Sequence, residues 1–118
     1  MPLRCDSIVI DCNDPPLVAA FWSRALELEL HGPNEEDELW LELGDGCPGI
    51  LFGHVPEVKT VKDRIHLDLR PDDQSAQVKR LIALGARRVD VGQGDVTWVV
   101  LADPEGNEFC VLRARSDG

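Results

Sequence analysis

The sequence predicts an α+β fold of two tandem βαβββ modules, with a curved mixed sheet around a concave cavity and the helices on the outside. First, a short β-branched segment is followed by an amphipathic helix twice along the chain. Second, the two halves match each other. "IVIDC" from Ile8 matches "IHLDL" from Ile65 at an offset of 57 residues, and "WLELGDGCPG" from Trp40 matches "WVVLADPEGN" from Trp98 at an offset of 58. Such internal similarity indicates a duplicated module.

One domain is expected for 118 residues, and the repeat places module one at about residues 5–58 and module two at about 62–115. No apolar run approaches the ~18 residues that a membrane helix needs. The amino-terminal segment lacks the layout of a secretory signal, so the cytoplasm is the expected location. The four cysteines show no CxxC spacing and are expected to be buried apolar side chains rather than disulfides or ligands of a zinc ion.

The first module opens with the strand segment "SIVIDC", after which Asp14 and Pro15 form a helix start. The Asp14 side chain can accept the first unpaired N–H groups, and Pro15 loses no hydrogen bond at the first helical position. The helix "PPLVAAFWSRALEL" presents a broad apolar stripe of Leu17, Phe21, Ala25 and Leu28, widened by Val18, Trp22 and Leu26. Further strands are expected near residues 27–32, 38–44 and 49–55.

The second module repeats this order, beginning with the strand "RIHLDLR". Because side chains alternate along a strand, one face carries Ile65, Leu67 and Leu69 toward the helix. The other face carries His66, Asp68 and Arg70 toward the cavity, as Ser7, Val9 and Asp11 do in the first module.

The second helix, "QSAQVKRLIAL", is expected to be capped by Asp72 and Asp73 and to end at Gly85, which suits a left-handed C-terminal cap. Its buried stripe is Val78, Leu81 and Ile82. Strands follow at about 86–92, 96–102 and 107–113. The turn "DPEGNEF" joins the last two, and Asp103 is expected to cap it through its own side chain rather than to act in catalysis.

The net charge argues against two classes of partner. Twelve Lys and Arg residues against 22 Asp and Glu residues give a formal charge of −10, which repels the phosphates of nucleic acids and of anionic membranes. An acidic cleft would attract cations instead. We therefore expect neither nucleic acid nor an anionic membrane as partner, and the charge on its own is explained by the solubility of a small domain. A small-molecule ligand is expected in the predicted concave cavity.

The order of four motifs resembles the vicinal oxygen chelate superfamily, which includes glyoxalase I, bleomycin resistance proteins and extradiol dioxygenases. The motifs are "DCNDPPLVAAFW", "RIHLDLRPDD", "LIALGARRV" and "VLADPEGNEFCVL". They cover nearly the whole chain, and the similarity is greatest to short glyoxalase-like domains. The resemblance implies a homodimer. It leaves open whether the cavity is completed by two modules of one chain or by modules of two chains.

The metal enzymes of that superfamily take one ligand from the opening strand and one from the last strand of each module. The resemblance places these positions at His66 and Cys110 in the second module, and near Ser7 and Phe52 in the first. Ser and Phe cannot replace an imidazole or a carboxylate, and a catalytic divalent metal needs about three protein ligands. The resemblance therefore leaves His66 and Cys110 as metal ligands and does not favour a bound metal. If the register differs, further ligands could come from Asp6, Asp11, Glu42, His54, Asp68 or Glu108, of which strand alternation lets only some reach the cavity.

Two functions remain open. One is a glyoxalase-like lyase or isomerase acting next to a carbonyl, with His66 as catalytic base or ligand. The other is non-catalytic sequestration of a cationic or aromatic small molecule, as in bleomycin resistance proteins. His66 can equally be a polar residue with no chemical role, and His31 and His54 are expected to face solvent. The predicted ligand-binding residues are Ser7, Asp11, Trp40, Phe52, Asp68, Arg70, Trp98 and Cys110.

Overall fold

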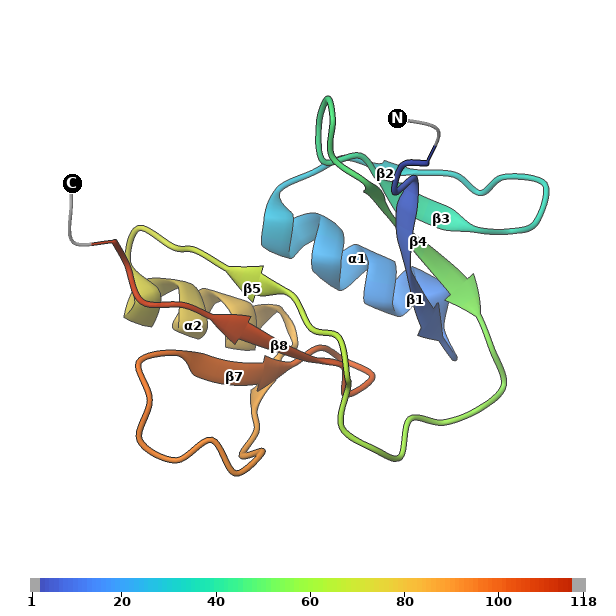
Figure 1. The fold of residues 1–118 in the computed structure, drawn as a ribbon. Coiled ribbons are helices and arrows are strands. Elements are labelled where there is room, and N and C mark those ends of the chain that lie inside the picture. Colours follow the sequence, from blue (N-terminus) through green and yellow to red (C-terminus); the bar gives the residue numbers. More distant parts are fainter. Residues whose placement is uncertain (1–2, 116–118) are drawn as a thin grey trace. The chain divides into compact units, whose positions relative to one another are not determined.

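The computed structural model describes residues 3–115 and has the predicted α+β fold, with two successive βαβββ modules (Figure 1). The chain divides into two compact units, Met1–Val58 and Lys59–Gly118. Each unit holds one four-stranded mixed sheet and one α-helix. Neither helix is long and apolar enough to cross a membrane, within the residues that the structure describes.

The first unit consists of β1 (Ser7–Cys12), α1 (Pro15–Leu26), β2 (Leu30–His31), β3 (Leu39–Leu41) and β4 (Gly49–His54). The strands lie in the order β1-β4-β3-β2, with β1 parallel to β4 and the other neighbours antiparallel. The long connection through α1 allows β1 and β4 to run in parallel.

Helix α1 begins as predicted. The Asp14 side chain accepts a hydrogen bond from the backbone N–H of Leu17 at 3.3 Å, and Pro15 occupies the first turn. The buried face differs from the predicted stripe, since Leu17 is 49% exposed while Val18, Phe21 and Trp22 are buried. Pro15 and Ala19 are buried as well, so the buried face is rotated away from Leu17 toward Pro15, Val18 and Trp22.

The second unit consists of β5 (Asp68–Leu69), α2 (Gln74–Leu84), β6 (Arg87–Arg88), β7 (Val99–Ala102) and β8 (Glu108–Val111). The strands lie in the order β5-β8-β7-β6, so β8 lies between β5 and β7 (Figure 1). Strand β5 is parallel to β8, and the other neighbours are antiparallel.

Helix α2 has both predicted caps. The Asp73 side chain accepts from the N–H of Ala76 at 3.1 Å, and Gly85 ends the helix with φ of 127°, a conformation that a side chain would strain. Val78 is buried, but Ile82, which the periodicity placed in the same stripe, is 40% exposed.

The opening strand of the second unit is shorter than predicted. Only Asp68 and Leu69 form β5, and Ile65, expected to face the helix, is 83% exposed. The first backbone hydrogen bond from β8 reaches the carbonyl oxygen of Leu67, so residues 64–66 precede the ladder. Without a paired neighbour, alternation alone does not direct Ile65 into the core.

The first and last strands of the two units correspond at one constant offset along the chain. The N–H of Val55 donates to the carbonyl of Cys12, and the N–H of Leu112 donates to the carbonyl of Leu69, both at 2.8 Å. Each pair is related to the other by 57 residues, so the offset of 58 that matches the Trp motifs does not extend to the last strands. Phe52 therefore corresponds to Phe109, and both are core residues, at 0% and 1% exposure. The first-unit counterpart of Cys110 is Gly53.

The turn between β7 and β8 confirms the structural role predicted for Asp103. This residue is fully buried, and its Oδ1 accepts from the N–H groups of Glu105 and Asn107, each at 3.0 Å. Gly106 takes a positive φ of 92°, as the turn requires. The four cysteines form no disulfide, and Cys12 and Cys110 are buried whereas Cys5 and Cys47 are exposed.

Candidate functional site

The second unit contains a pocket of about 510 Å³ over the sheet face that is not packed on α2. Residues from β5, β7 and β8, from the segment preceding β5 and from the loop before β7 line it. We call it the second-unit pocket. Its lining is Lys62, His66, Asp68, Val91, Gly92, Gln93, Trp98, Val100, Glu108, Cys110 and Leu112.

Strand alternation explains why these side chains converge. Trp98 and Val100 are two residues apart along β7 and its approach, and Glu108, Cys110 and Leu112 are two apart along β8 and its continuation. Residues with this spacing lie on one face of a sheet. Leu101, which follows Val100, and Phe109, between Glu108 and Cys110, are buried in the core on the opposite face.

Three polar side chains of the second-unit pocket form a compact group, which we call the donor cluster: His66, Asp68 and Cys110. Asp68 and Cys110 are direct neighbours in the parallel β5–β8 pair, and His66 precedes Asp68 by two residues. Nε2 of His66 lies 3.2 Å from Oδ1 of Asp68. One donor atom of each residue lies within 4.8 Å of the other two, and the side chains of His66 and Asp68 are 41% and 51% exposed.

The Cys110 thiol is held in its protonated form. Burial raises the pKa of Cys110, and the charge of Asp68 and a hydrogen bond with that carboxylate raise it further, against the opposing charge of Lys62. A thiolate there would be desolvated and close to a second negative charge. Cys110 is therefore a weak nucleophile while no cation balances the cluster.

A second charged group, the Glu108 clasp, consists of Lys59, Asp63 and Glu108 at one side of the pocket. Nζ of Lys59 donates to Oε2 of Glu108 at 2.8 Å, and the N–H of Asp63 donates to its Oε1 at 2.7 Å. Nζ also lies 3.7 Å from Oδ1 of Asp63. The clasp ties the segment that leads to His66 onto β8.

The clasp moves the pKa values of its two acids in opposite directions. Burial disfavours the charged form of Glu108, but the Asp63 N–H and Lys59 outweigh it and lower the pKa of Glu108. Burial and then the charge of Glu108 raise the pKa of Asp63, against the attraction of Lys59. Glu108 is thus a carboxylate whose two oxygens are already bonded.

The first unit has a smaller pocket of about 340 Å³, the first-unit pocket, which includes Ser7 and Trp40. His31 stacks on Trp40 with 5.8 Å between ring centroids and approaches Glu42 at 4.0 Å. His31 is half-buried by this stacking, contrary to the solvent-facing position expected from its neighbouring turn. The remaining lining residues are Asp6, Asn34, Glu42, Gly49, Ile50 and Leu51.

The structure separates the predicted site residues into three groups. The second-unit pocket brings together His66, Asp68, Trp98 and Cys110, whereas Ser7 and Trp40 lie in the first-unit pocket.

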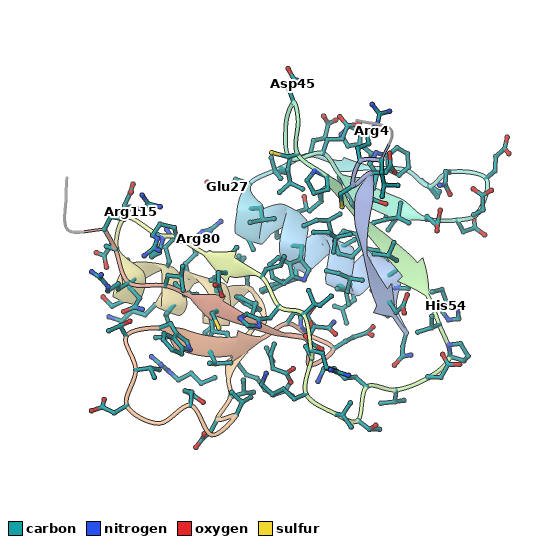
Figure 2. The ribbon with its side chains drawn as sticks, in the orientation of Figure 1. Arg4, Glu27, Asp45, His54, Arg80 and Arg115 are labelled. Atoms are coloured by element: carbon teal, nitrogen blue, oxygen red, sulfur yellow. The ribbon has the colours of Figure 1, made fainter. Side chains whose placement is uncertain are left out.

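The other predicted residues line neither pocket. The Phe52 side chain is fully buried in the first-unit core, because β4 turns it toward α1. Asp11 is exposed beside Gly53, and Arg70 donates to the carbonyl of Arg113 at 2.8 Å. His54 is exposed at the end of β4, as expected (Figure 2).

Of the eleven residues that line the second-unit pocket, seven were not among the predicted site residues. Val100 and Leu112 lie two positions from Trp98 or Cys110, so the same alternation would have found them. Glu108, two positions before Cys110, was expected only as a substitute metal ligand. Val91, Gly92 and Gln93 belong to an irregular loop, and Lys62 belongs to the irregular start of the second unit before β5. Neither segment has a periodic pattern that predicts a position.

The superfamily resemblance implies a divalent metal. The donor cluster offers three ligands for this metal, where the resemblance positions of the second module offered two. The two resemblance positions in the second unit, His66 and Cys110, are joined by the Asp68 carboxylate, which gives an imidazole, a thiol and a carboxylate in one place. Three such ligands and an open position are the usual protein contribution to a catalytic zinc site. The corresponding first-unit residues, 57 positions earlier, are Val9, Asp11 and Gly53.

Comparison with known proteins agrees with the fold. The family described as a glyoxalase-like domain matches residues 7–112. The solved structure named Oxidase ChaP-H2 is 14% identical with a TM-score of 0.70, and the match covers 100% of this chain and 98% of that one. No curated protein matches the sequence.

Two further solved structures have the same fold. A glyoxalase/bleomycin resistance protein/dioxygenase family enzyme from Burkholderia phytofirmans PsJN is 20% identical with a TM-score of 0.66, and 90% of this chain and 94% of that one are covered. A variant of the fosfomycin resistance protein FosX from Listeria monocytogenes is 13% identical with a TM-score of 0.70, covering 97% and 92%. That FosX variant is complexed with Mn(II) and 1S,2S-dihydroxypropylphosphonic acid.

Proposed function

The chain belongs to the glyoxalase-like domain family of the vicinal oxygen chelate superfamily, and on this premise we propose that it binds a small organic molecule in the second-unit pocket. The observation that carries the proposal is the composition of this pocket. Apolar side chains form much of its lining, and the donor cluster supplies a few convergent polar groups. A concave, mostly apolar site with a small number of placed polar groups is typical of small-molecule pockets, and about 510 Å³ is within their usual size.

The lining favours a flat ligand with a polar end. Trp98 is 40% exposed although it is a large apolar side chain, so a planar ligand can stack on its ring. Val100 and Leu112 extend the apolar surface beside it. At the polar end, Asp68 and Lys62 carry opposite charges, while the charge of Glu108 is already paired with Lys59. We propose an aromatic molecule with an oxygen-containing or amino substituent.

Quenching of tryptophan fluorescence tests this binding. The full chain is titrated with two probes of opposite charge, 2-naphthoate and 2-naphthylmethylamine. We expect saturable quenching by at least one of them, and at least a fivefold rise in Kd for Trp98→Ala because the stacking surface is lost.

The matched control is Trp40→Ala, which removes a tryptophan of the first-unit pocket. Its Kd should stay within twofold of the parent protein. Equal weakening by the two substitutions, or no saturable quenching by either probe, would contradict binding in the second-unit pocket.

The contact between His66 and Asp68 favours catalysis as a further step. With Nε2 of His66 only 3.2 Å from Oδ1 of Asp68, the neutral ring keeps its proton on Nε2 and presents Nδ1 as the basic nitrogen. Such a base can remove a proton next to a carbonyl, which is the chemistry of a lyase or isomerase. A divalent ion held by the donor cluster would occupy the imidazole of His66 and so replace this role, supplying polarisation of that carbonyl instead. We therefore propose His66 as the general base, held in position by Asp68.

Solvent deuterium exchange separates this catalysis from non-catalytic sequestration of a cationic or aromatic molecule. Hydroxyacetone in D₂O is incubated with the protein, and loss of its CH₂ proton signal is followed by NMR. The catalytic hypothesis predicts exchange that His66→Ala reduces at least tenfold and that His54→Ala, an exposed first-unit histidine, leaves unchanged. Probe binding with no exchange above buffer would favour sequestration.

We also propose that the protein is a homodimer. Strand β1 has six residues and lies at an edge of the first-unit sheet, with Val9 on it 51% exposed. An exposed edge strand is readily paired or covered, and two-fold pairing is the commonest oligomer. Light scattering at micromolar concentration should give twice the chain mass, and the mass of one chain would refute the dimer.

A further inference from the structure

Two cysteines of the first unit are exposed, although the sequence predicted buried thiols. Cys5 lies two residues before β1, and Cys47 lies two residues before β4. These strands are parallel neighbours in which Ser7 pairs with Gly49, 42 positions later. Cys47 likewise follows Cys5 by 42 positions. The register of the strand pair therefore brings the two thiols to equivalent places, just before its first paired residues.

The pairing of β1 with β4 extends toward the cysteines. The N–H of Gly49 donates to the carbonyl of Asp6 at 3.1 Å, which places Asp6 opposite Pro48. Each cysteine immediately precedes one of these two residues. Figure 1 shows the segment before β1 and the connection from β3 to β4 at the same end of the first-unit sheet. The two thiols thus belong to adjoining segments although 41 residues separate them in sequence.

The local geometry leaves room for the sulfur atoms to meet. Neighbouring strands lie about 4.7 to 4.9 Å apart, within the range of about 4.4 to 6.8 Å between the Cα atoms of a disulfide. The Cys5 thiol lies along its own strand, 3.9 Å from the carbonyl oxygen of Ser7, so it must rotate toward β4. Cys47 closes a turn by donating its N–H to the carbonyl of Gly44 at 3.1 Å. A side chain added at Gly44 or Gly46 would meet no atom within 4 Å, so this turn has open space in which to shift.

We propose that Cys5 and Cys47 form a reversible disulfide that fastens the beginning of β1 to the beginning of β4. The oxidant is a small disulfide of the glutathione type. One cysteine thiolate attacks a sulfur of the oxidant, which gives a mixed disulfide and releases one thiol of the oxidant. The other cysteine then attacks the protein sulfur of the mixed disulfide and releases the second thiol. Two electrons pass from the protein to the oxidant, and the two protons of the protein thiols end on the two released thiols.

The disulfide acts as a brace for the edge of the first unit. Strand β1 is an edge strand, and the loop that the bond closes contains α1, β2 and β3. A cross-link that closes a long loop restricts the unfolded chain and so favours the folded one. Because Asp6, Ser7 and Gly49 line the first-unit pocket, the bond also holds one side of this pocket.

Mass spectrometry of the full chain tests the bond. Reduced protein is incubated with oxidised glutathione while folded, then unfolded and labelled with N-ethylmaleimide without reduction. We expect four labels on the reduced protein and two on the oxidised protein, at the buried Cys12 and Cys110. Peptides of the oxidised protein should contain Cys5 linked to Cys47. Mixed disulfides with glutathione should amount to less than a tenth of this product, because the second thiol resolves them.

Single variants test the resolving step. Cys47→Ser leaves the thiol of Cys5 without a partner, so the glutathione adduct on Cys5 should rise at least tenfold, and Cys5→Ser should do the same for Cys47. Both residues are exposed, so serine fits either place. The matched control is Asp45→Ala, an exposed position of the same turn, which should form the linked product as the parent does (Figure 2).

Urea unfolding measures the brace. Oxidation should raise the midpoint of the parent protein by at least about 1 M, because the closed loop is long. The double variant with Cys5→Ser and Cys47→Ser should have the same midpoint with and without oxidised glutathione.

Several results would overturn the proposal. Four labels after oxidation, or stable glutathione adducts on both cysteines of the parent, would exclude the disulfide. A link to Cys12 or Cys110, or a disulfide between two chains on a non-reducing gel, would show a different pairing. A linked product with an unchanged urea midpoint would support the bond and overturn the brace. The naphthyl probes and the second-unit pocket enter none of these measurements, so the disulfide stands or falls independently of the proposed function.

Discussion

The Glu108 clasp predicts that Lys59→Met destabilises the protein. Methionine keeps most of the apolar stem and the length of lysine, so the change removes mainly the charge. The side chains of Lys59, Asp63 and Glu108 are 22%, 21% and 14% exposed. Without the ammonium group, two carboxylates stay close together in a poorly solvated place, and Glu108 loses one of its hydrogen bonds.

The magnitude lies between two limits. Fully exposed ion pairs contribute about 0.2 to 1 kcal/mol, whereas removing one partner of a buried pair costs about 3 to 5 kcal/mol. For a mostly buried clasp that still touches solvent we expect a loss of about 2 kcal/mol in the free energy of unfolding. With a urea m-value of about 1.5 kcal/mol/M, the midpoint should fall by about 1.3 M.

Urea unfolding followed by far-UV circular dichroism measures this shift. Lys79→Met, at an exposed lysine on α2, controls for the loss of a positive charge from an acidic protein. In the double variant with Lys59→Met and Glu108→Gln, no unpaired carboxylate remains at position 108, so more than half of the lost stability should return. The reasoning is refuted if Lys59→Met lies within about 0.5 kcal/mol of Lys79→Met.

Three further predictions concern the core, the turn and the thiols. Trp22→Ala should lower the free energy of unfolding by about 3 to 5 kcal/mol in urea titrations, because the 1% exposed indole leaves a cavity; a loss below 1 kcal/mol would contradict its place in the core. Asp103→Ala leaves two backbone donors unbonded and should cost about 2 to 4 kcal/mol in the same assay, and near-neutral behaviour would argue against the turn. Metal-free protein should show two fast thiols with Ellman's reagent, Cys5 and Cys47, and fast reaction of buried Cys110 would contradict its burial and raised pKa.

The sequence was sufficient for the fold because its signals there are local. Asp14 and Asp73 cap their helices as predicted, Gly85 ends α2, and Asp103 is the buried centre of its turn. A side chain that bonds its own backbone a few residues away needs no tertiary partner, so such patterns can be read from neighbouring letters.

The candidate site was predicted only in part. The sequence indicates which segments are strands, but the side chains that meet at the site depend on which residues pair across neighbouring strands. Matching short motifs allowed offsets of 57 and 58, and the second placed Phe52 where Gly53 stands. The two offsets differ by one residue, which exchanges the faces of a sheet and turns a cavity residue into a core residue. The same dependence left Ile65 exposed, since no strand pairs with the residues around it.

Local patterns were enough to predict two βαβββ modules, the caps of their helices, and a shared strand face for His66 and Asp68. The pairing of distant segments places Cys110 beside them, joins Lys59 to Glu108, and brings the loop at Val91 to Gln93 to the pocket. Each of these depends on segments far apart in sequence being brought together by a hydrogen-bond register, which local patterns do not encode.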